Sequence, residues 1–311
     1  MVRHHGIEVW VGFTAVIGVL LLLDLFVLNR RSHVLSLKES AWWTSGLVTL
    51  AALFGLFLFR REGTDAMLEY YAGYLLELSL SVDNLFVFIL LFQYFAVPPA
   101  VRPKVLKWGI LGALLMRGIM ILAGAALLQR FEWIIYLFGG VLIVTGARMF
   151  GGGDEEVHPE RNPLLRFLKK ILPIAEGYDG DRFFLQGVTG RVMATPLLVV
   201  LIMVEWTDLV FAIDSIPAVY GVTRDPFIVY SSNIFAILGL RALFFLLAGV
   251  MDSFRYLKPG VALILIFIGL KMALSYWVHL SIGLSLGVIG GILTAAILLS
   301  LWKRPRVGQT P

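Results

Sequence analysis

Residues 77–86 read ELSLSVDNLF, and residues 208–217 read DLVFAIDSIP. Each stretch carries two acids that are six positions apart in otherwise apolar sequence, and a polar residue, Asn84 or Ser215, follows the second acid. A further acid, Glu205, lies about one helical turn before the second stretch. A charge at the centre of a membrane span costs about 2.5 kcal/mol or more, so acids retained there indicate function. Because the arrangement occurs twice, this interpretation is favoured over chance.

The composition indicates that these stretches lie in a membrane. The chain has 311 residues, of which 59% are hydrophobic and 15% are charged, whereas about 25% are charged in a typical soluble domain. Apolar runs of roughly 17–25 residues predict about nine transmembrane helices, because a helix satisfies its own backbone polar groups in lipid. We therefore expect an all-α polytopic membrane protein with spans at 7–28, 41–59, 67–95, 105–128, 131–149, 192–217, 227–250, 260–278 and 281–302. The first run is too long for a signal-peptide core and lacks a small-residue cleavage site, so we expect it to be retained.

The distribution of basic residues predicts the orientation. With the N-terminus outside, the inside segments hold 18 of the 26 lysines and arginines and the outside segments hold 5. This bias follows the positive-inside rule and places the C-terminus in the cytoplasm of a bacterium, with the chain in the inner membrane. The net charge of +5 is explained by topology, and we expect no nucleic-acid partner.

The chain also repeats itself. Aligning Asp83 on Asp214 brings Arg117 near Arg241, and TGARM at 145–149 then matches IGLKM, which begins at residue 268. Spans three to five and six to eight are therefore interpreted as two copies of one unit. Three spans are an odd number, so the second copy enters the membrane from the opposite side, as in the inverted repeats of secondary transporters.

This repeat divides the chain into five parts. The linker is expected to be solvated, with an interfacial helix around 161–172, and the helices outside the repeats are expected to be peripheral. The parts are 1–60 (helices one and two), 61–150 (repeat one), 151–191 (cytoplasmic linker), 192–278 (repeat two) and 279–311 (last helix and basic tail).

Helical geometry sets a condition on the acids. At 100° per residue, Glu77 and Asn84 share a face, whereas Asp83 lies about 120° away. In the second copy Asp208 and Ser215 share a face with Glu205, and Asp214 is displaced by the same angle. All the acids meet at one point only if both helices break, which Pro217 favours in the second copy because it removes a helical N–H.

The polar side chains of the two stretches predict a site for a hard cation. Carboxylate, amide and carbonyl oxygens suit Mg²⁺, Ca²⁺ and Mn²⁺, and the chain has no cysteine to supply a thiolate. The candidate metal ligands are Glu77, Asp83, Asn84, Glu205, Asp208 and Asp214, with Ser215, Arg117 and Arg241 in supporting roles. The arginines would pair with some of the acids, and because burial favours the protonated carboxylate, protons are the candidate counter-ion. The five histidines are placed in tails, loops and a span end, and we expect them to be solvated or interfacial.

The acidic stretches, together with Val204-Glu205 and Leu240-Arg241-Ala242-Leu243, resemble the TerC family of integral membrane proteins over about residues 8–303. This family takes its name from tellurium resistance and belongs to a wider superfamily of cation and amino-acid exporters. The resemblance implies that the six candidate ligands form the intramembrane acidic site, and that manganese is the favoured ion.

We therefore expect a transporter that exports a divalent cation, Mn²⁺ before Ca²⁺, Mg²⁺ or Fe²⁺, by alternating access. One alternative is a non-transporting membrane factor in a stress-resistance or membrane-protein assembly complex, in which the acids hold helices together and the linker binds partners. Amino-acid efflux is a third option, but a site rich in acids suits a bare cation better than a zwitterion. We expect no enzymatic activity and no cofactor, because no nucleophile–base pairing, phosphate loop or cofactor motif occurs in the sequence.

Overall fold

The computed structural model describes residues 5–22, 36–131, 133–150, 163–186, 192–247, 256–277 and 280–302. Within these ranges it leaves out the side chains of Asp83, Phe86, Arg241, Leu247 and Leu301. Two predicted site residues, Asp83 and Arg241, therefore have a backbone position but no described side-chain contacts.

The described chain is a bundle of helices, and each of the nine apolar runs contains one. In chain order the elements are α1 Ile7–Leu22, α2 Leu37–Glu62, α3 Thr64–Tyr94, the 3-10 turn η2 Pro99–Val101, α4 Arg102–Arg130, α5 Ile134–Phe150, α6 Pro163–Ile171, β1 Phe184–Gln186, β2 Val192–Ala194, α7 Pro196–Tyr220, α8 Pro226–Leu247, α9 Leu257–Ala273 and α10 Ile282–Trp302. Five of the helical segments are long and apolar enough to cross a membrane, and further shorter apolar helices accompany them. The expected helical, multi-pass architecture is confirmed.

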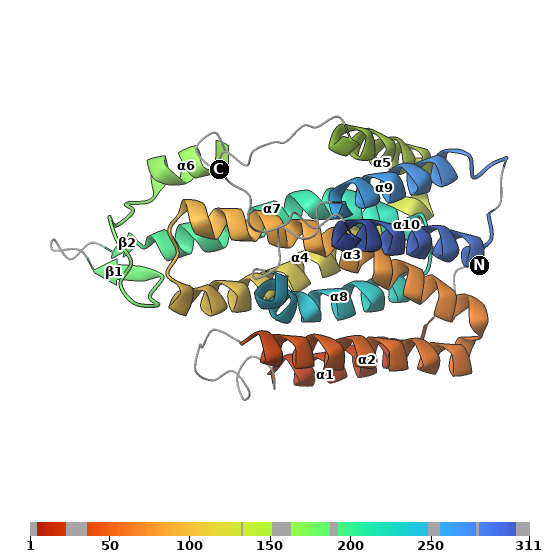
Figure 1. Cartoon of the computed structure of the whole chain (residues 1–311), viewed down its shortest axis with the longest axis horizontal. Coiled ribbons are helices and arrows are strands. Elements are labelled where there is room, and N and C mark those ends of the chain that lie inside the picture. The colour runs from red at the N-terminus through yellow and green to blue at the C-terminus, as the bar shows by residue number, and fades with distance from the viewer. Residues whose placement is uncertain are drawn as a thin grey trace.

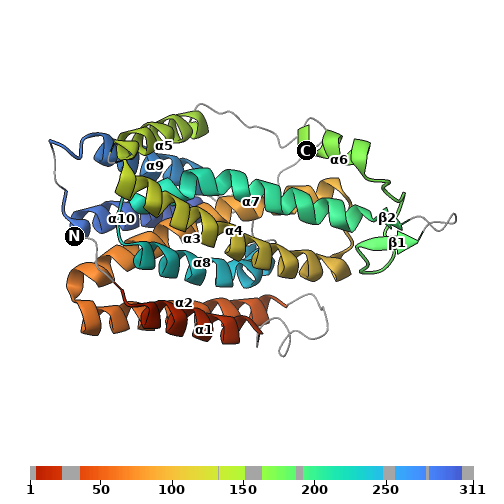
Figure 2. The same cartoon turned by 180° about the vertical axis from the view of Figure 1, so that it is seen from behind.

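The long helices run side by side along the longest axis of the molecule (Figure 1). Helices α1 and α2 lie on one face, and α5 and α9 lie on the opposite face, with α3, α4, α7, α8 and α10 between them; the view from behind agrees (Figure 2). Helix α2 packs on α8 and α3, while α10 packs on α3 and α9. The central layer therefore holds the helices that carry both acidic stretches.

Local sequence signals set both ends of α2. Helix α2 begins with a capping box, in which the backbone N–H of Glu39 donates to Ser36 Oγ and the N–H of Ser36 donates to Glu39 Oε2. It ends at Gly63, whose φ of +92° favours glycine because other residues rarely adopt positive φ. This single residue joins α2 to α3.

Helices α5 and α9 approach each other most closely at two glycine contacts. A Cβ added to Gly139 would lie 2.9 Å from the carbonyl oxygen of Gly269, and one added to Gly146 would lie 2.7 Å from that of Ala262. As the residue number rises on α5 it falls on α9, so the two helices are antiparallel. Small residues at such positions allow membrane helices to pack backbone against backbone.

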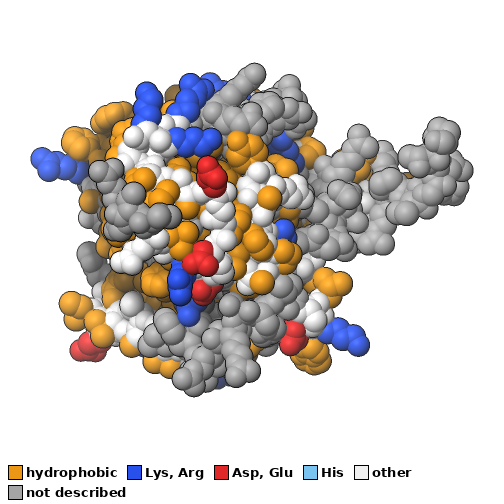
Figure 3. All heavy atoms as spheres, turned by 90° about the vertical axis from the view of Figure 1, so that its left-hand side faces the viewer, with side chains coloured by type: hydrophobic (Ala, Val, Ile, Leu, Met, Phe, Trp, Pro, Cys, Tyr) orange, Lys and Arg blue, Asp and Glu red, His pale blue; other side chains and the backbone are white. Residues whose placement is uncertain are grey.

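One end of the bundle carries the linker. A helix, α6, lies in the range where an interfacial helix was expected, with Leu165 and Leu168 buried and Arg166, Lys169 and Lys170 exposed. A two-stranded antiparallel sheet, β1 paired with β2, follows it and was absent from our expectations, because three-residue strands leave no recognisable periodicity. Lysine and arginine side chains gather along the upper edge of this end, at the height of α6 (Figure 3).

Large apolar side chains cover the outside of the bundle. On α4, for example, Leu115 is 67% exposed and Ile119 is 60% exposed. Exposed apolar faces of this kind exceed what a soluble monomer tolerates and suit contact with lipid. They agree with the membrane location that the composition indicates.

Candidate functional site

A buried arginine joins the two acidic stretches. Arg117 lies near the middle of α4, and its side chain is 1% exposed. Its Nε donates to Asp208 Oδ2 at 3.1 Å, and its Nη2 donates to Asp208 Oδ1 at 2.9 Å. Its third nitrogen, Nη1, forms an ion pair with Glu77 Oε1. One guanidinium therefore holds an acid of α3 and an acid of α7 at the same level of the bundle.

Asn84 of α3 also approaches Asp208. Its Nδ2 lies 3.5 Å from Asp208 Oδ1, and it is 2% exposed. Glu77 and Asn84 thus meet the same partner network from one face of α3, as helical spacing predicts. We call Glu77, Asn84, Arg117 and Asp208 the central cluster.

Several buried oxygens of the same helix faces are unpaired. Glu77 Oε2, Ser81 Oγ and Ser215 Oγ find no hydrogen-bond partner among the described residues. A buried polar atom without a partner costs free energy, about 1–3 kcal/mol in mutational data. All three are hard oxygen donors, which is the ligand type that Mn²⁺, Mg²⁺ and Ca²⁺ accept.

Glu205 lies next to the central cluster, on the side nearer the start of α7. Its carboxylate packs against Gly112 of α4 so closely that a Cβ at this glycine would collide with it. Glu205 and Asp208 also line a narrow cleft whose other walls are apolar, including Leu85, Ala113 and Leu240. The cleft therefore brings two carboxylates of α7 into one space.

The remaining acid of the second stretch has a different partner. Asp214 is half-buried and accepts a hydrogen bond from Thr145 Oγ1 on α5 at 3.0 Å. Thr145 was not expected at the site, although it belongs to the TGARM repeat motif. The side chain of Asp83, the corresponding acid on α3, lies outside the described part of the structure.

The expected helix breaks are absent. Helix α3 is continuous from Thr64 to Tyr94, and α7 is continuous from Pro196 to Tyr220 with Pro217 inside it. Pro217 occupies the last turn of α7, where the loss of a single N–H donor does not interrupt the helix that follows. Because α7 stays helical, Asp208 and Asp214 point about 120° apart, and the prediction that both reach one point through a broken helix was wrong.

One histidine also departs from expectation. His5 was expected to be solvated or interfacial; its side chain is only 7% exposed, which contradicts a solvated position, and it contacts Glu62 and Asp225. Both partners are far from His5 in sequence, so no local motif could have identified the contact.

The family and the relatives of the chain agree with this picture. Residues 62–307 match the family model described as the integral membrane protein TerC family. This range includes both acidic stretches and Arg117, but it excludes α1 and almost all of α2.

Curated relatives cover nearly the whole chain. An uncharacterized membrane protein of Myxococcus xanthus is 47% identical over 94% of this chain and 92% of its own length. Proteins of Salmonella typhi and Escherichia coli (strain K12), both provisionally named membrane-bound redox modulator Alx, are 45% and 44% identical over 94% and 96% of this chain and 94% and 95% of their own lengths. No solved structure matches the chain.

Proposed function

Because this chain belongs to the TerC family of integral membrane proteins, we propose that it is a transporter that exports a divalent metal cation, with Mn²⁺ as the expected ion. The observation that carries the proposal is the burial of Glu77 and Asp208 around one shared Arg117. Burying an ion pair is costly, and ionisable groups inside a membrane bundle mark ion pathways. The unpaired oxygens beside the cluster supply additional ligands of the same hard type.

In this mechanism Arg117 acts as a tethered counter-charge. One guanidinium cannot neutralise two carboxylates, whereas a divalent cation can. A cation that reaches Glu77 and Asp208 competes with Arg117 for the same oxygens, and the guanidinium replaces the ion when it leaves. Protons are the proposed coupling ion, because carboxylates in an apolar site favour protonation when they lose a cation.

The cleft beside Glu205 supports access from the end of the bundle that carries α6. Its lining residues lie between the central cluster and that end: Leu85 and Phe88 follow Asn84 on α3, while Leu106 and Ala113 precede Arg117 on α4. Toward the opposite end, the rings of Tyr70 and Tyr74 stack with centroids 6.3 Å apart, and both side chains are buried. An ion would therefore enter from the α6 end and leave at the opposite end after the rings of Tyr70 and Tyr74 move apart.

Alternating access would use two inverted three-helix repeats. The contacts between α5 and α9 support this part of the proposal, because the alignment of TGARM with IGLKM places Gly139 on Ala262 and Gly146 on Gly269. Exchanging the two copies then converts the contact between Gly139 and Gly269 into that between Ala262 and Gly146. A pseudo-twofold axis in the membrane plane relates helices in this way.

We propose that the α6 end faces the cytoplasm of a bacterial inner membrane, with the N-terminus outside. The exposed Arg166, Lys169 and Lys170 of α6 give this end the positive charge that cytoplasmic segments carry. Transport in this orientation is export.

The names of the relatives raise a second candidate function, a membrane-bound factor that affects redox state without transporting ions. The Alx proteins of Salmonella typhi and Escherichia coli are named membrane-bound redox modulators, and the name says nothing of ion transport. This chain contains no cysteine, so it could not act by thiol–disulfide exchange. We therefore favour transport, from which a redox effect would follow indirectly through the metal that is moved.

A cellular experiment tests the proposal. Cells that accumulate Mn²⁺ would express the wild type, Asp208→Asn, Asp83→Asn or Asp214→Asn, with total manganese measured by mass spectrometry. Asp181→Asn is the matched control, because Asp181 is an exposed acid in a surface pair with Lys104, which contributes little. We expect the wild type and the control to lower cellular manganese and the three other variants to fail. Normal lowering of manganese by correctly inserted Asp208→Asn would contradict the proposal.

A further inference from the structure

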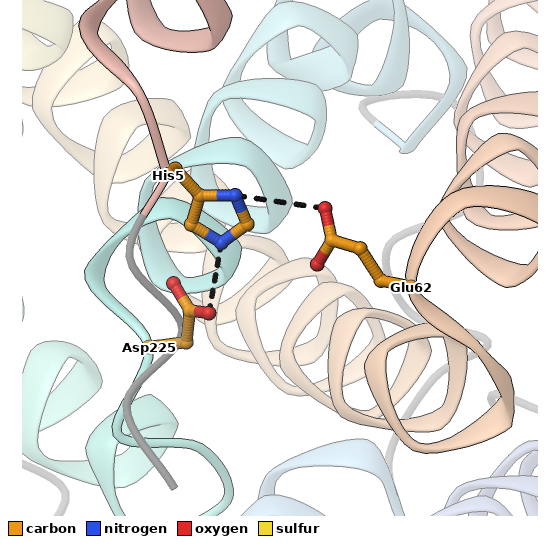
Figure 4. Close-up of side chains that lie close together, drawn as sticks. All are labelled: His5, Glu62 and Asp225. Atoms are coloured by element: carbon orange, nitrogen blue, oxygen red, sulfur yellow. Dashed lines mark hydrogen bonds and ion pairs between the residues drawn. The ribbon is translucent and has the colours of Figure 1, made fainter.

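A second group of metal-binding side chains lies at the end of the bundle opposite α6. His5 precedes α1, Glu62 is the last residue of α2, and Asp225 precedes α8 (Figure 4). His5 Nε2 lies 2.9 Å from Asp225 Oδ2, and His5 Nδ1 lies 3.5 Å from Glu62 Oε1. One ligand atom from each of the three residues falls within 4.8 Å of the other two. Three segments that are far apart in sequence thus converge on one small volume.

These side chains are largely shielded from solvent. The exposed fractions of the His5, Glu62 and Asp225 side chains are 7%, 14% and 2%. Glu62 Oε2 is buried and has no hydrogen-bond partner among the described residues. Glu62 and Asp225 place two shielded carboxylates beside one imidazole. Together they carry more negative charge than a single protonated histidine can neutralise, whereas a divalent cation would neutralise both.

Neighbouring contacts hold the ligands in place. Asp225 Oδ1 accepts a hydrogen bond from the backbone N–H of Phe227 at 3.0 Å, which leaves Oδ2 directed at His5. The His5 ring packs on the Phe227 ring with centroids 4.6 Å apart. Thr223 Oγ1 accepts from the N–H of Asp225 and donates to Glu69 Oε2 on α3. Outer contacts of this kind orient metal ligands and strengthen binding.

We propose that His5, Glu62 and Asp225 bind a Zn²⁺ ion at a site separate from the central cluster. One imidazole nitrogen with two carboxylates suits Zn²⁺, whereas Mg²⁺, Ca²⁺ and Mn²⁺ prefer an all-oxygen set. The ion would fasten the start of α1 and the end of α2 to the start of α8. The inference rests on this geometry alone and does not require that the protein transports anything.

Metal binding to the purified full-length protein tests the site. The protein, in detergent and with any affinity tag removed, is titrated with Zn²⁺ or with Ca²⁺, and bound metal and melting temperature are measured. All measurements use the Asp208→Asn background, in which the central cluster has lost one of its two carboxylates. In that background we expect one bound equivalent of Zn²⁺ and a rise in melting temperature on Zn²⁺ addition, with neither effect reproduced by Ca²⁺.

Adding His5→Gln or Glu62→Gln should abolish that equivalent and the rise in melting temperature. Asp65→Asn is the matched control, because Asp65 is an exposed acid three residues from Glu62, and it should change neither quantity. Glu62→Gln keeps the shape of the side chain, so it carries the test if His5→Gln fails to fold. Retention of the bound equivalent in Glu62→Gln, or no Zn²⁺ binding in the Asp208→Asn background, would overturn the proposal. The metal count in this test does not depend on whether Asp208→Asn transports Mn²⁺, so failure of the transport proposal would not overturn the proposed Zn²⁺ site.

Discussion

Arg117 on α4 holds Asp208 on α7 through two hydrogen bonds, of 3.1 Å from Nε to Oδ2 and 2.9 Å from Nη2 to Oδ1, inside the bundle. When a guanidinium donates two parallel hydrogen bonds to a carboxylate, the interaction is both strong and directional. Because the same arginine also pairs with Glu77, one side chain of α4 makes polar contacts with an acid of α3 and an acid of α7. The following predictions test how this arrangement and its surroundings work.

Removing the arginine alone should destabilise the protein more than removing all three charged groups of the central cluster. Arg117→Met leaves Glu77 and Asp208 buried without a counter-charge, which costs about 3–5 kcal/mol when a buried pair is broken. The triple variant Glu77→Gln, Arg117→Met, Asp208→Asn leaves no uncompensated charge and should recover most of that loss. The measurement is thermal unfolding in detergent, in which the fraction of protein that stays monodisperse is recorded as the temperature rises. A triple variant that is no more stable than Arg117→Met would show that charge compensation is not what Arg117 contributes.

Gly112 should be required for the position of Glu205. A Cβ at Gly112 collides with the Glu205 carboxylate, so Gly112→Ala should push this acid away from the cleft and reduce manganese export. Gly118→Ala on the same helix is the matched control, because its nearest neighbour is an atom of Tyr230 at 3.8 Å. Cellular manganese content checks both variants. Equal export by Gly112→Ala and Gly118→Ala would remove Glu205 from the transport path.

A side chain should be tolerated at Gly140 of α5, which lies away from α9, but not at Gly139, which contacts α9. Gly139→Ala places a Cβ 2.9 Å from the carbonyl oxygen of Gly269, whereas Gly140→Ala meets nothing within 4 Å. Overpacking of this kind costs about 1–3 kcal/mol, while alanine in place of glycine favours a helix by up to about 1 kcal/mol. Melting temperatures should therefore fall for Gly139→Ala and stay level or rise for Gly140→Ala. The reverse order would contradict the close packing.

The absence of cysteine from the sequence makes the proposed orientation directly testable. Lys170→Cys lies on the exposed face of α6, and Asp65→Cys lies in the exposed first turn of α3 at the opposite end. A membrane-impermeant maleimide added to spheroplasts should label Asp65→Cys only. Inside-out vesicles should give the opposite result. Labelling of Lys170→Cys from the outside would reverse the orientation and the direction of transport.

The sequence predicted the helices and the shared faces of the acids, because both depend on local periodicity. Nine apolar runs contain nine of the helices, and Glu77 and Asn84 reach one network from a single face of α3. The sequence predicted that Arg117 pairs with some of the acids but did not identify Glu77 and Asp208 as its partners, since periodicity does not state which helix faces meet. Similarly, Thr145 opposite Asp214 and Gly112 opposite Glu205 depend on the packing of α5 and α4 against α7.

The main error concerned the continuity of the helices. Proline predicts a break from local chemistry, but its effect depends on how much helix follows, and α7 ends three residues after Pro217. His5 was misplaced for a different reason, since its partner Asp225 is 220 residues away. Both features depend on tertiary position.

The most direct test of the central claim is Mn²⁺ flux into liposomes that contain the purified protein and a dye quenched by Mn²⁺. The account predicts that the wild type and Asp181→Asn admit Mn²⁺, whereas Glu77→Gln and Asp208→Asn give the flux of protein-free liposomes. Flux through Asp208→Asn equal to that of the wild type would contradict the assignment of the central cluster as the transport site.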